Sequence, residues 1–97
     1  MKFLKLVKSE NPDKKYDVYL LDEEGKQHKV SFGASGYSDF TKHKDESRKL
    51  LYLERHRKRE DWTKSGILTS GFWSRWILWN RPSLQASLED VRQRFQL

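Results

Sequence analysis

The chain contains no cysteine among its 97 residues. This absence excludes a disulfide scaffold, a cysteine-ligated zinc finger and thiol chemistry, and it is typical of proteins in a reducing compartment. No uninterrupted apolar run approaches the roughly 18 residues that span a bilayer, and the apolar stretch at the N-terminus is too short for a signal peptide. We therefore expect a protein that works in a reducing compartment, without a membrane as its partner.

Aliphatic residues are also scarce, since only 35% of the residues are hydrophobic and another 35% are charged. Aromatic residues, in contrast, make up 13% of the chain, with four Trp, four Tyr and five Phe, whereas disordered chains are poor in aromatic residues. A chain of this length forms one domain. We expect residues 1–97 to fold as a single domain around a small core of rings, and to gain stability by docking onto something larger.

The common catalytic motifs are missing as well. The sequence has no phosphate-binding loop of the G-x-x-x-x-G-K-[ST] type, no G-x-G-x-x-G and no H-E-x-x-H. His43 and His56 are more than three helical turns apart, so they cannot share a metal ion on one helix, and the adjacent Asp45 and Glu46 face different directions. The sequence therefore predicts a protein that is not an enzyme and that holds no metal or cofactor.

The first third of the chain, residues 1–33, has the period-two pattern of β-strands. Three runs around residues 3–7, 16–21 and 27–32 are separated by turn residues, among them Pro12 and Gly25. This pattern predicts a three-stranded antiparallel meander. Tyr19 and Leu21 leave its second face partly apolar, so we expect something to cover that face. Residues 33–36 (GASG) then break the pattern and predict a hinge.

The next segment, residues 42–60, predicts one basic helix, with Thr41 as its N-cap. It has eight Lys or Arg against four Asp or Glu and contains no Gly or Pro. Its apolar stripe is thin, so most of its surface is expected to be in water, and the helix could break near Arg57 or become ordered only when it binds a partner.

A tryptophan-rich segment follows, with Ser70 as its expected N-cap and Pro82 as its stop. At 100° per residue, five apolar residues fall in one arc of about 160°: Phe72, Trp73, Trp76, Ile77 and Trp79. Ser74, Arg75 and Leu78 fall outside it. Such an arc fits a core helix that covers the sheet, an anchor for a partner protein, or, less well, an interfacial membrane helix. The shortage of aliphatic residues favours the core.

The final helix has the clearest helical pattern in the chain. Ser83 is its expected N-cap, and its apolar residues recur at i, i+4, i+7 and i+11: Leu84, Leu88, Val91 and Phe95. Because the strands come first and the helices after them, we expect an α+β fold, a three-stranded antiparallel meander followed by about three helices.

The basic residues are the strongest functional signal, because the chain has 20 Lys and Arg against 14 Asp and Glu, a net charge of +6. Arginine predominates after residue 47, and its planar fork suits phosphate or carboxylate. The candidate residues for a phosphate or partner are Arg48, Lys49, Arg55, Arg57, Arg59 and Arg75. The alternative is a solvated helix face that Glu54 and Glu60 balance.

The residues from Tyr37 onward also resemble a known group of proteins. The first half of the similarity consists of YSDFT at 37–41, HKD at 43–45, RK at 48–49, Tyr52, RH at 55–56 and EDW at 60–62. The second half consists of Gly66, GFWSRWILWN at 71–80, Pro82, Ser87 and RF at 94–95. Residues 37–97 thus resemble small, uncharacterised proteins encoded by large nucleocytoplasmic DNA viruses, the giant viruses and their relatives. The meander is outside this similarity, which implies a viral context and no settled activity.

Two functions follow from these observations as hypotheses. The first is a non-enzymatic structural protein of the virion, a minor capsid or cement component that docks onto larger capsid subunits, either in the particle or in the host-cell cytoplasm. Its free strand edge could add to a neighbouring sheet, and its contact aromatics, unless they form the core, would be Phe72, Trp73, Trp76 and Trp79. The second is a sequence-independent nucleic-acid-binding protein that uses the basic helix 42–60.

Overall fold

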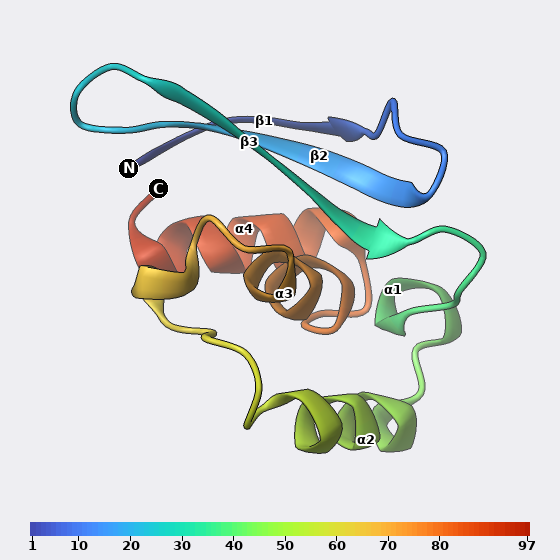
Figure 1. The fold of residues 1–97 in the computed structure, drawn as a ribbon. Helices are drawn as coiled ribbons and strands as arrows, with labels where there is room; N and C mark the ends of the chain where they lie inside the picture. Colours follow the sequence, from blue (N-terminus) through green and yellow to red (C-terminus); the bar gives the residue numbers. More distant parts are fainter.

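The computed structural model describes all residues, 1–97, and has three strands followed by helices (Figure 1). The strands are β1 (Lys2–Lys8), β2 (Lys14–Leu21) and β3 (Gln27–Ala34). The helical elements are α1 (Phe40–His43), α2 (Glu46–His56), η1 (Lys64–Gly66), α3 (Ser70–Trp73), the π-helix η2 (Ser74–Leu78) and α4 (Leu84–Phe95). The predicted α+β fold is confirmed.

The sheet is an antiparallel meander in the order β1-β2-β3. Val18 is paired with Leu6 on one side and Val30 on the other. Figure 1 shows all the helices on one side of this sheet. The core therefore lies between the inner face of the sheet and the segment from α3 to α4. Its fully buried side chains are Val18, Leu20, Phe32, Phe72, Trp73, Ile77 and Val91.

Strand β1 departs from strict alternation. Phe3 is paired with Leu20 and Lys5 with Tyr19, so Leu4 is an extra residue, a β-bulge. The bulge lets both Phe3 and Leu6 pack against the core, although they are three residues apart. Strict alternation would place Phe3 and Leu6 on opposite faces of the strand, so the period-two pattern does not hold beyond Leu4.

The outer face of the sheet is open. No helix lies on that side (Figure 1), so the expected cover is not a helix of this chain. Tyr19 is instead flanked by the Nζ atom of Lys5, 4.7 Å from the ring centroid. Asp17 on the same face accepts hydrogen bonds from the Ser9 and Ser31 hydroxyl groups, at 2.7 and 2.6 Å. Short polar contacts and a lysine stem thus replace the expected layer.

The predicted hinge is the end of β3 and the turn after it. Gly33 has a φ of +81°, and a Cβ atom there would lie 2.8 Å from Cδ1 of Leu78 and 3.1 Å from Cβ of Lys15. Only glycine fits this close approach of the strand to η2. Gly36, with a φ of +86°, then turns the chain toward α1.

The single basic helix predicted over 42–60 was wrong, because two aspartates each begin a short helix. Asp39, rather than Thr41, caps α1 and accepts a hydrogen bond from the backbone N–H of Thr41. Lys44 ends α1 in the left-handed conformation, and Asp45 caps α2 by accepting from the N–H groups of Ser47 and Arg48. Helix α2 ends at His56 with Arg57 as its C-cap, the predicted break point.

The tryptophan-rich segment forms the core layer on the sheet. Its N-cap is Thr69 instead of Ser70, whose hydroxyl donates to the carbonyl of Ser31. In η2 the N–H of Trp79 bonds to the carbonyl of Ser74, five residues back. This wider turn rotates the chain less per residue than an α-helix does, which brings Leu78 onto the buried side at 3% exposure, against the prediction that it lies outside the apolar arc.

Helix α4 closes the fold as predicted. Ser83 caps it by accepting from the N–H of Ala86 at 3.1 Å. Val91 is fully buried, and Leu84, Leu88 and Phe95 pack against the core. No helix in the structure is both long enough and apolar enough to span a bilayer.

Candidate functional site

Helix α2 lies at the edge of the molecule and has no buried residue (Figure 1). The ring of Tyr52 stacks on Trp79 at 4.4 Å with 4° between the planes, and His56 stacks on the other side of Tyr52 at 4.2 Å. Lys49 donates from Nζ to the carbonyl of Asn80 at 2.7 Å. A few side chains on one stripe thus hold α2 to the body, and the rest of its surface is free.

Four of the predicted phosphate-binding residues are on this free surface. Arg48 and Arg55 are exposed on α2, and Arg57 and Arg59 are exposed in the turn after it. None of them has a carboxylate within 4.0 Å. Neither Glu54 nor Glu60 forms an ion pair with these arginines, because Glu60 lies 3.7 Å from His56 and Glu54 has no basic partner within 4.0 Å. The alternative of a solvated helix face stays a prediction.

The other two predicted residues, Lys49 and Arg75, are held in the structure. The Nζ atom of Lys49 lies 5.0 Å from the ring centroid of Phe40, and burial lowers the pKa of this lysine. Arg75 donates to the carbonyl of Trp79 at 2.7 Å, and its guanidinium group lies 4.3 Å from the ring centroid of Trp76. Burial also lowers the pKa of Arg75. These contacts hold Lys49 and Arg75 against neighbouring parts of the protein, so neither side chain is free to bind a ligand.

The predicted aromatic residues belong mainly to the core. Phe72 and Trp73 are fully buried and Trp76 is 9% exposed, whereas Trp79 is half-buried under Tyr52. The indole N–H groups of Trp73 and Trp76 donate to the carbonyls of Ile67 and Trp62, at 2.7 and 2.9 Å. Of the predicted set, only Trp79 reaches the surface cleft described next.

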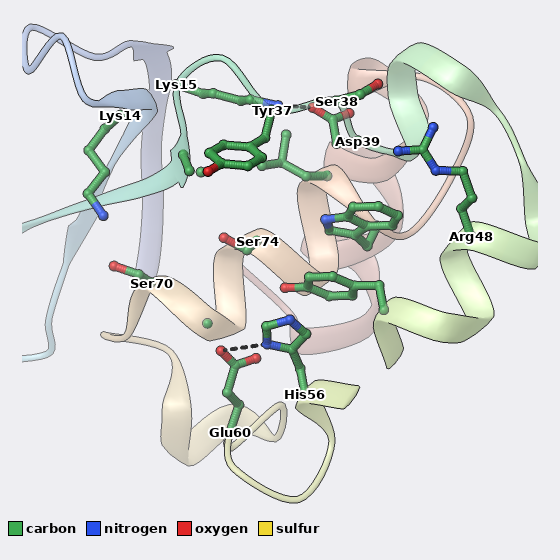
Figure 2. A pocket seen from close by; sticks show the side chains of 16 residues that line it. Lys14, Lys15, Tyr37, Ser38, Asp39, Arg48, His56, Glu60, Ser70 and Ser74 are labelled. Carbon is green, nitrogen blue, oxygen red and sulfur yellow. Dashed lines mark hydrogen bonds and ion pairs between the residues drawn. The ribbon is translucent and has the colours of Figure 1, made fainter. Parts of the chain in front are cut away.

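A cleft of about 640 Å³ separates α2 from the sheet and from α3 (Figure 2). Helix α2 lines it with Arg48, Tyr52 and His56, spaced i, i+4 and i+8 on one helix face. The opposite wall is built from Ser70, Ser74 and Leu78 at the same spacing, and the remaining wall comes from β2, from the end of β3 and from the loop that follows it. The residues of this last wall are Lys14, Lys15, Gly33, Ala34, Tyr37, Ser38 and Asp39.

The cleft has a positive balance of charge. Lys15 is neutralised by an ion pair with buried Asp39, at 2.5 Å between Nζ and Oδ2. The Glu60 carboxylate lies 3.7 Å from the ring nitrogen of His56 and against Gly71, where a Cβ atom would approach its Cδ to 2.7 Å, and it is the one acid of the cleft without a Lys or Arg partner. Lys14 and Arg48 have no acidic partner. An anionic ligand would therefore meet two unpaired cations there.

Several polar side chains of the cleft make no hydrogen bond within the chain. These side chains are Lys14, Tyr37, Ser38, Arg48, Tyr52 and Ser74. The Tyr52 hydroxyl, like any tyrosine hydroxyl, is protonated at neutral pH and able to donate, and burial raises its pKa further. The structure has no group of three or more side chains arranged to hold a metal ion. The free groups are donors suited to the oxygens of an anion.

The sequence interpretation missed this cleft. It did not single out Lys14 or Tyr37, and it gave Tyr52 and His56 no binding role. The spacing of Arg48, Tyr52 and His56 was the one available signal, because residues four apart share a helix face. The opposite wall had no signal, since strands, loop and helix meet only in the folded chain.

A known protein family matches the N-terminal part of this fold. The model of DUF5754, a family of unknown function, matches residues 4–56, which is more than half of the chain. The chain belongs to DUF5754. The DUF5754 match covers the sheet, α1 and α2, and so contains Lys14, Tyr37, Arg48 and Tyr52, whereas the tryptophan-rich segment lies outside it. No curated protein and no solved structure matches the chain. The resemblance to proteins of large DNA viruses stays a prediction.

Proposed function

We propose that this DUF5754 protein is a non-enzymatic nucleic-acid-binding protein that contacts phosphates through α2 and the turn after it, without sequence preference. One observation supports the proposal most strongly: Arg48, Arg55, Arg57, Lys58 and Arg59 are all exposed, and none has a carboxylate within 4.0 Å. An arginine on a helix can pair with an acid three or four residues away, and none of these residues does so. Cations left free in one stretch are suited to a row of phosphates.

The test is the salt dependence of binding, measured by fluorescence anisotropy with a labelled duplex. Five phosphate contacts give a slope of about −4.5 in log K against log salt, so affinity should fall several hundredfold between about 50 and 200 mM salt. The double variant Arg55→Glu and Arg59→Glu should bind far more weakly and show a slope shallower by about two. Absence of a complex at about 50 mM salt would reject the proposal.

A matched control changes the charge equally elsewhere. Lys2→Glu with Lys26→Glu alters two exposed lysines at the end of the sheet that carries the β2–β3 hairpin (Figure 1). If α2 is the binding element, this control should keep most of the affinity. An equal loss in both double variants would show that only the net charge matters.

A second candidate function is supported by the leucines of the same helix. Leu50 is 64% exposed and Leu51 is 49% exposed, and exposed leucines are suited to a protein surface rather than to phosphates. We propose as the alternative that the protein is a minor capsid or cement component that docks through α2 onto larger virion subunits. In this alternative the leucines take the contact role first considered for Trp73 and Trp76, which lie in the core.

Particle composition tests this alternative. In the infected cells that the resemblance implies, mass spectrometry of purified particles stripped of DNA should detect the protein. The variant Leu50→Ser with Leu51→Ser should be lost from the particles, while Arg55→Glu with Arg59→Glu remains in them. Detection only in cell extracts, and never in particles, would exclude the structural role.

A further inference from the structure

The cleft beside α2 places two free cations at opposite ends of one recess. In Figure 2, Lys14 comes from the sheet at one end and Arg48 from α2 at the other, with the ring of Tyr37 between them. Neither cation has an acidic partner. A ligand that fills the recess would therefore have negative charge at both of its ends. Between these charges it would have a group that packs against an aromatic ring.

Tyr37 is the most exposed large aromatic residue near the cleft, at 73%. It follows the turn at Gly36, and neither its ring nor its hydroxyl contacts another aromatic or hydrogen-bonding side chain. An aromatic ring left in water beside a positive recess is a typical stacking surface for unpaired bases. An acidic peptide would use the two cations and leave this ring unused.

The deeper walls offer hydrogen bonds that the chain does not use. The hydroxyls of Ser74 and Tyr52 line the recess from opposite sides without a partner in the chain. At about 640 Å³ the recess is within the range of roughly 300–1,000 Å³ typical of sites for small ligands. A base that has left the helical stack fits such a recess, whereas a paired base in a duplex does not reach it.

The positive surface continues past the cleft. Arg48 and Arg55 also line a second, smaller hollow on the other side of Tyr52 and Trp79. These two arginines are seven residues apart, about 10 Å along the helix. A strand that leaves the cleft at Arg48 would meet Arg55 next, and then the exposed cations of the turn at residues 57–59.

We propose that the cleft binds an unpaired nucleotide of a single nucleic-acid strand, with its base stacked on Tyr37 and its two flanking phosphates at Lys14 and Arg48. This inference rests on the proposed nucleic-acid-binding function and makes the single strand, rather than the duplex, its preferred ligand. Helix α2 supplies the phosphate contacts on either form, and the cleft supplies the discrimination between them.

The experiment compares labelled 12-nucleotide single strands of DNA and of RNA with a duplex of the same sequence, by anisotropy at about 50 mM salt, where phosphate contacts are strong. The wild-type chain should bind a single strand more tightly than the duplex. Tyr37→Ala should weaken single-strand binding about tenfold, the equivalent of about 1.4 kcal/mol and within the range for one stacked base, and leave duplex binding unchanged. Tyr37→Phe, which keeps the ring, is the matched control and should bind as the wild type does.

The outcomes separate this inference from the function on which it rests. Equal binding of strand and duplex, with no effect of Tyr37→Ala, would overturn the cleft site while the phosphate contacts of α2 stand. No binding of any nucleic acid would overturn both. Displacement of the strand by a polyglutamate peptide whose own binding depends on Tyr37 would make the cleft a peptide site and overturn the inference. Because Tyr37 is exposed, all these variants should keep the wild-type circular dichroism spectrum.

Discussion

Two glycines matter in this fold because the side chain they lack leaves space for a neighbouring residue. Gly33 lets Leu78 and Lys15 approach the backbone where β3 ends, and Gly71 lets the Glu60 carboxylate lie against α3 at the edge of the cleft. The sequence interpretation took Gly33 as part of a hinge, from the loss of the strand pattern. It could not find the close approach, because the partner, Leu78, is 45 residues away and reaches Gly33 only through the π-turn of η2.

Replacing Gly33 tests this close approach. Gly33→Ala adds a Cβ atom 2.8 Å from Leu78, at a φ of +81°. Gly25→Ala is the matched control, since its φ is +84° and nothing lies within 4 Å of the added atom. We expect the control to lose about 1 kcal/mol of unfolding free energy through backbone strain alone, and Gly33→Ala to lose clearly more, in urea titrations. Equal losses in the two variants would show that Leu78 moves away from the added Cβ atom without a further loss of unfolding free energy.

At the scale of elements, α2 is the least anchored part of the fold. Its contacts with the body are the stack of Tyr52 on Trp79, the ring of His56 and the hydrogen bond from Lys49 to Asn80. The thin apolar stripe of residues 42–60 predicted a surface mostly in contact with water, and α2 has no buried residue, although the segment forms two short helices instead of one. The break between α1 and α2 could have been found as well, because Asp45 is a preferred N-cap residue. The stack could not, since Trp79 belongs to another element.

Removing the stack should release α2 and leave the core folded. An aromatic pair contributes about 0.5–1.5 kcal/mol, so Trp79→Ala should raise the hydrogen-exchange rate of residues 46–56 and leave the sheet protected. Trp73→Ala, at a fully buried position, should instead lower the unfolding free energy of the whole protein by about 3–5 kcal/mol. Faster exchange throughout the chain in Trp79→Ala would contradict the separation of α2 from the core.

At the scale of the whole molecule, the chain combines a small ring-rich core with a positive surface. The sequence predicted the meander, the final helix and the core position of the tryptophans, because each depends on a local period. It did not predict the cleft, which joins Lys14, Tyr37, Arg48 and Ser74 from separate segments. It also expected a second layer on the sheet, because the apolar character of Tyr19 and Leu21 did not reveal that Lys5 would cover the ring of Tyr19.

The lowered pKa values of four aspartates make the stability of the fold depend on pH. Burial raises the pKa of Asp17 and Asp90, but the hydrogen bonds that they accept outweigh it and leave both pKa values below the usual range. Hydrogen bonds from His28 and Ser65 lower the pKa of Asp22 and Asp61, respectively. A carboxyl group with a lowered pKa in the folded state stabilises the protein above its unfolded pKa, about 4, and this stability is lost as the pH falls through the folded pKa.

We therefore expect the melting temperature to be nearly constant from about pH 5 to 7 and to fall below about pH 4. Asp17→Asn keeps the shape of the buried side chain but removes its charge, so it should cost about 1–3 kcal/mol at pH 7. The cost should be smaller at about pH 3, which is below the unfolded pKa, so that part of the stabilisation by the ionised carboxyl group is already lost. Urea titrations at the two pH values measure this difference. A loss for Asp17→Asn that is as large in acid as at neutral pH would show that the charge of Asp17 does not contribute.

The placement of every helix on one side of the sheet determines which fragments of the chain can fold on their own. The region shared with DUF5754 stops at residue 56, yet the side chains that shield Val18, Leu20 and Phe32 from water come from α3, η2 and α4, all beyond that point. A fragment cut at the end of the shared region would keep the sheet, α1 and α2 but lose the elements that cover the apolar face of the sheet, so we expect it to aggregate. The unit that sequence similarity marks out is thus smaller than the unit that can fold.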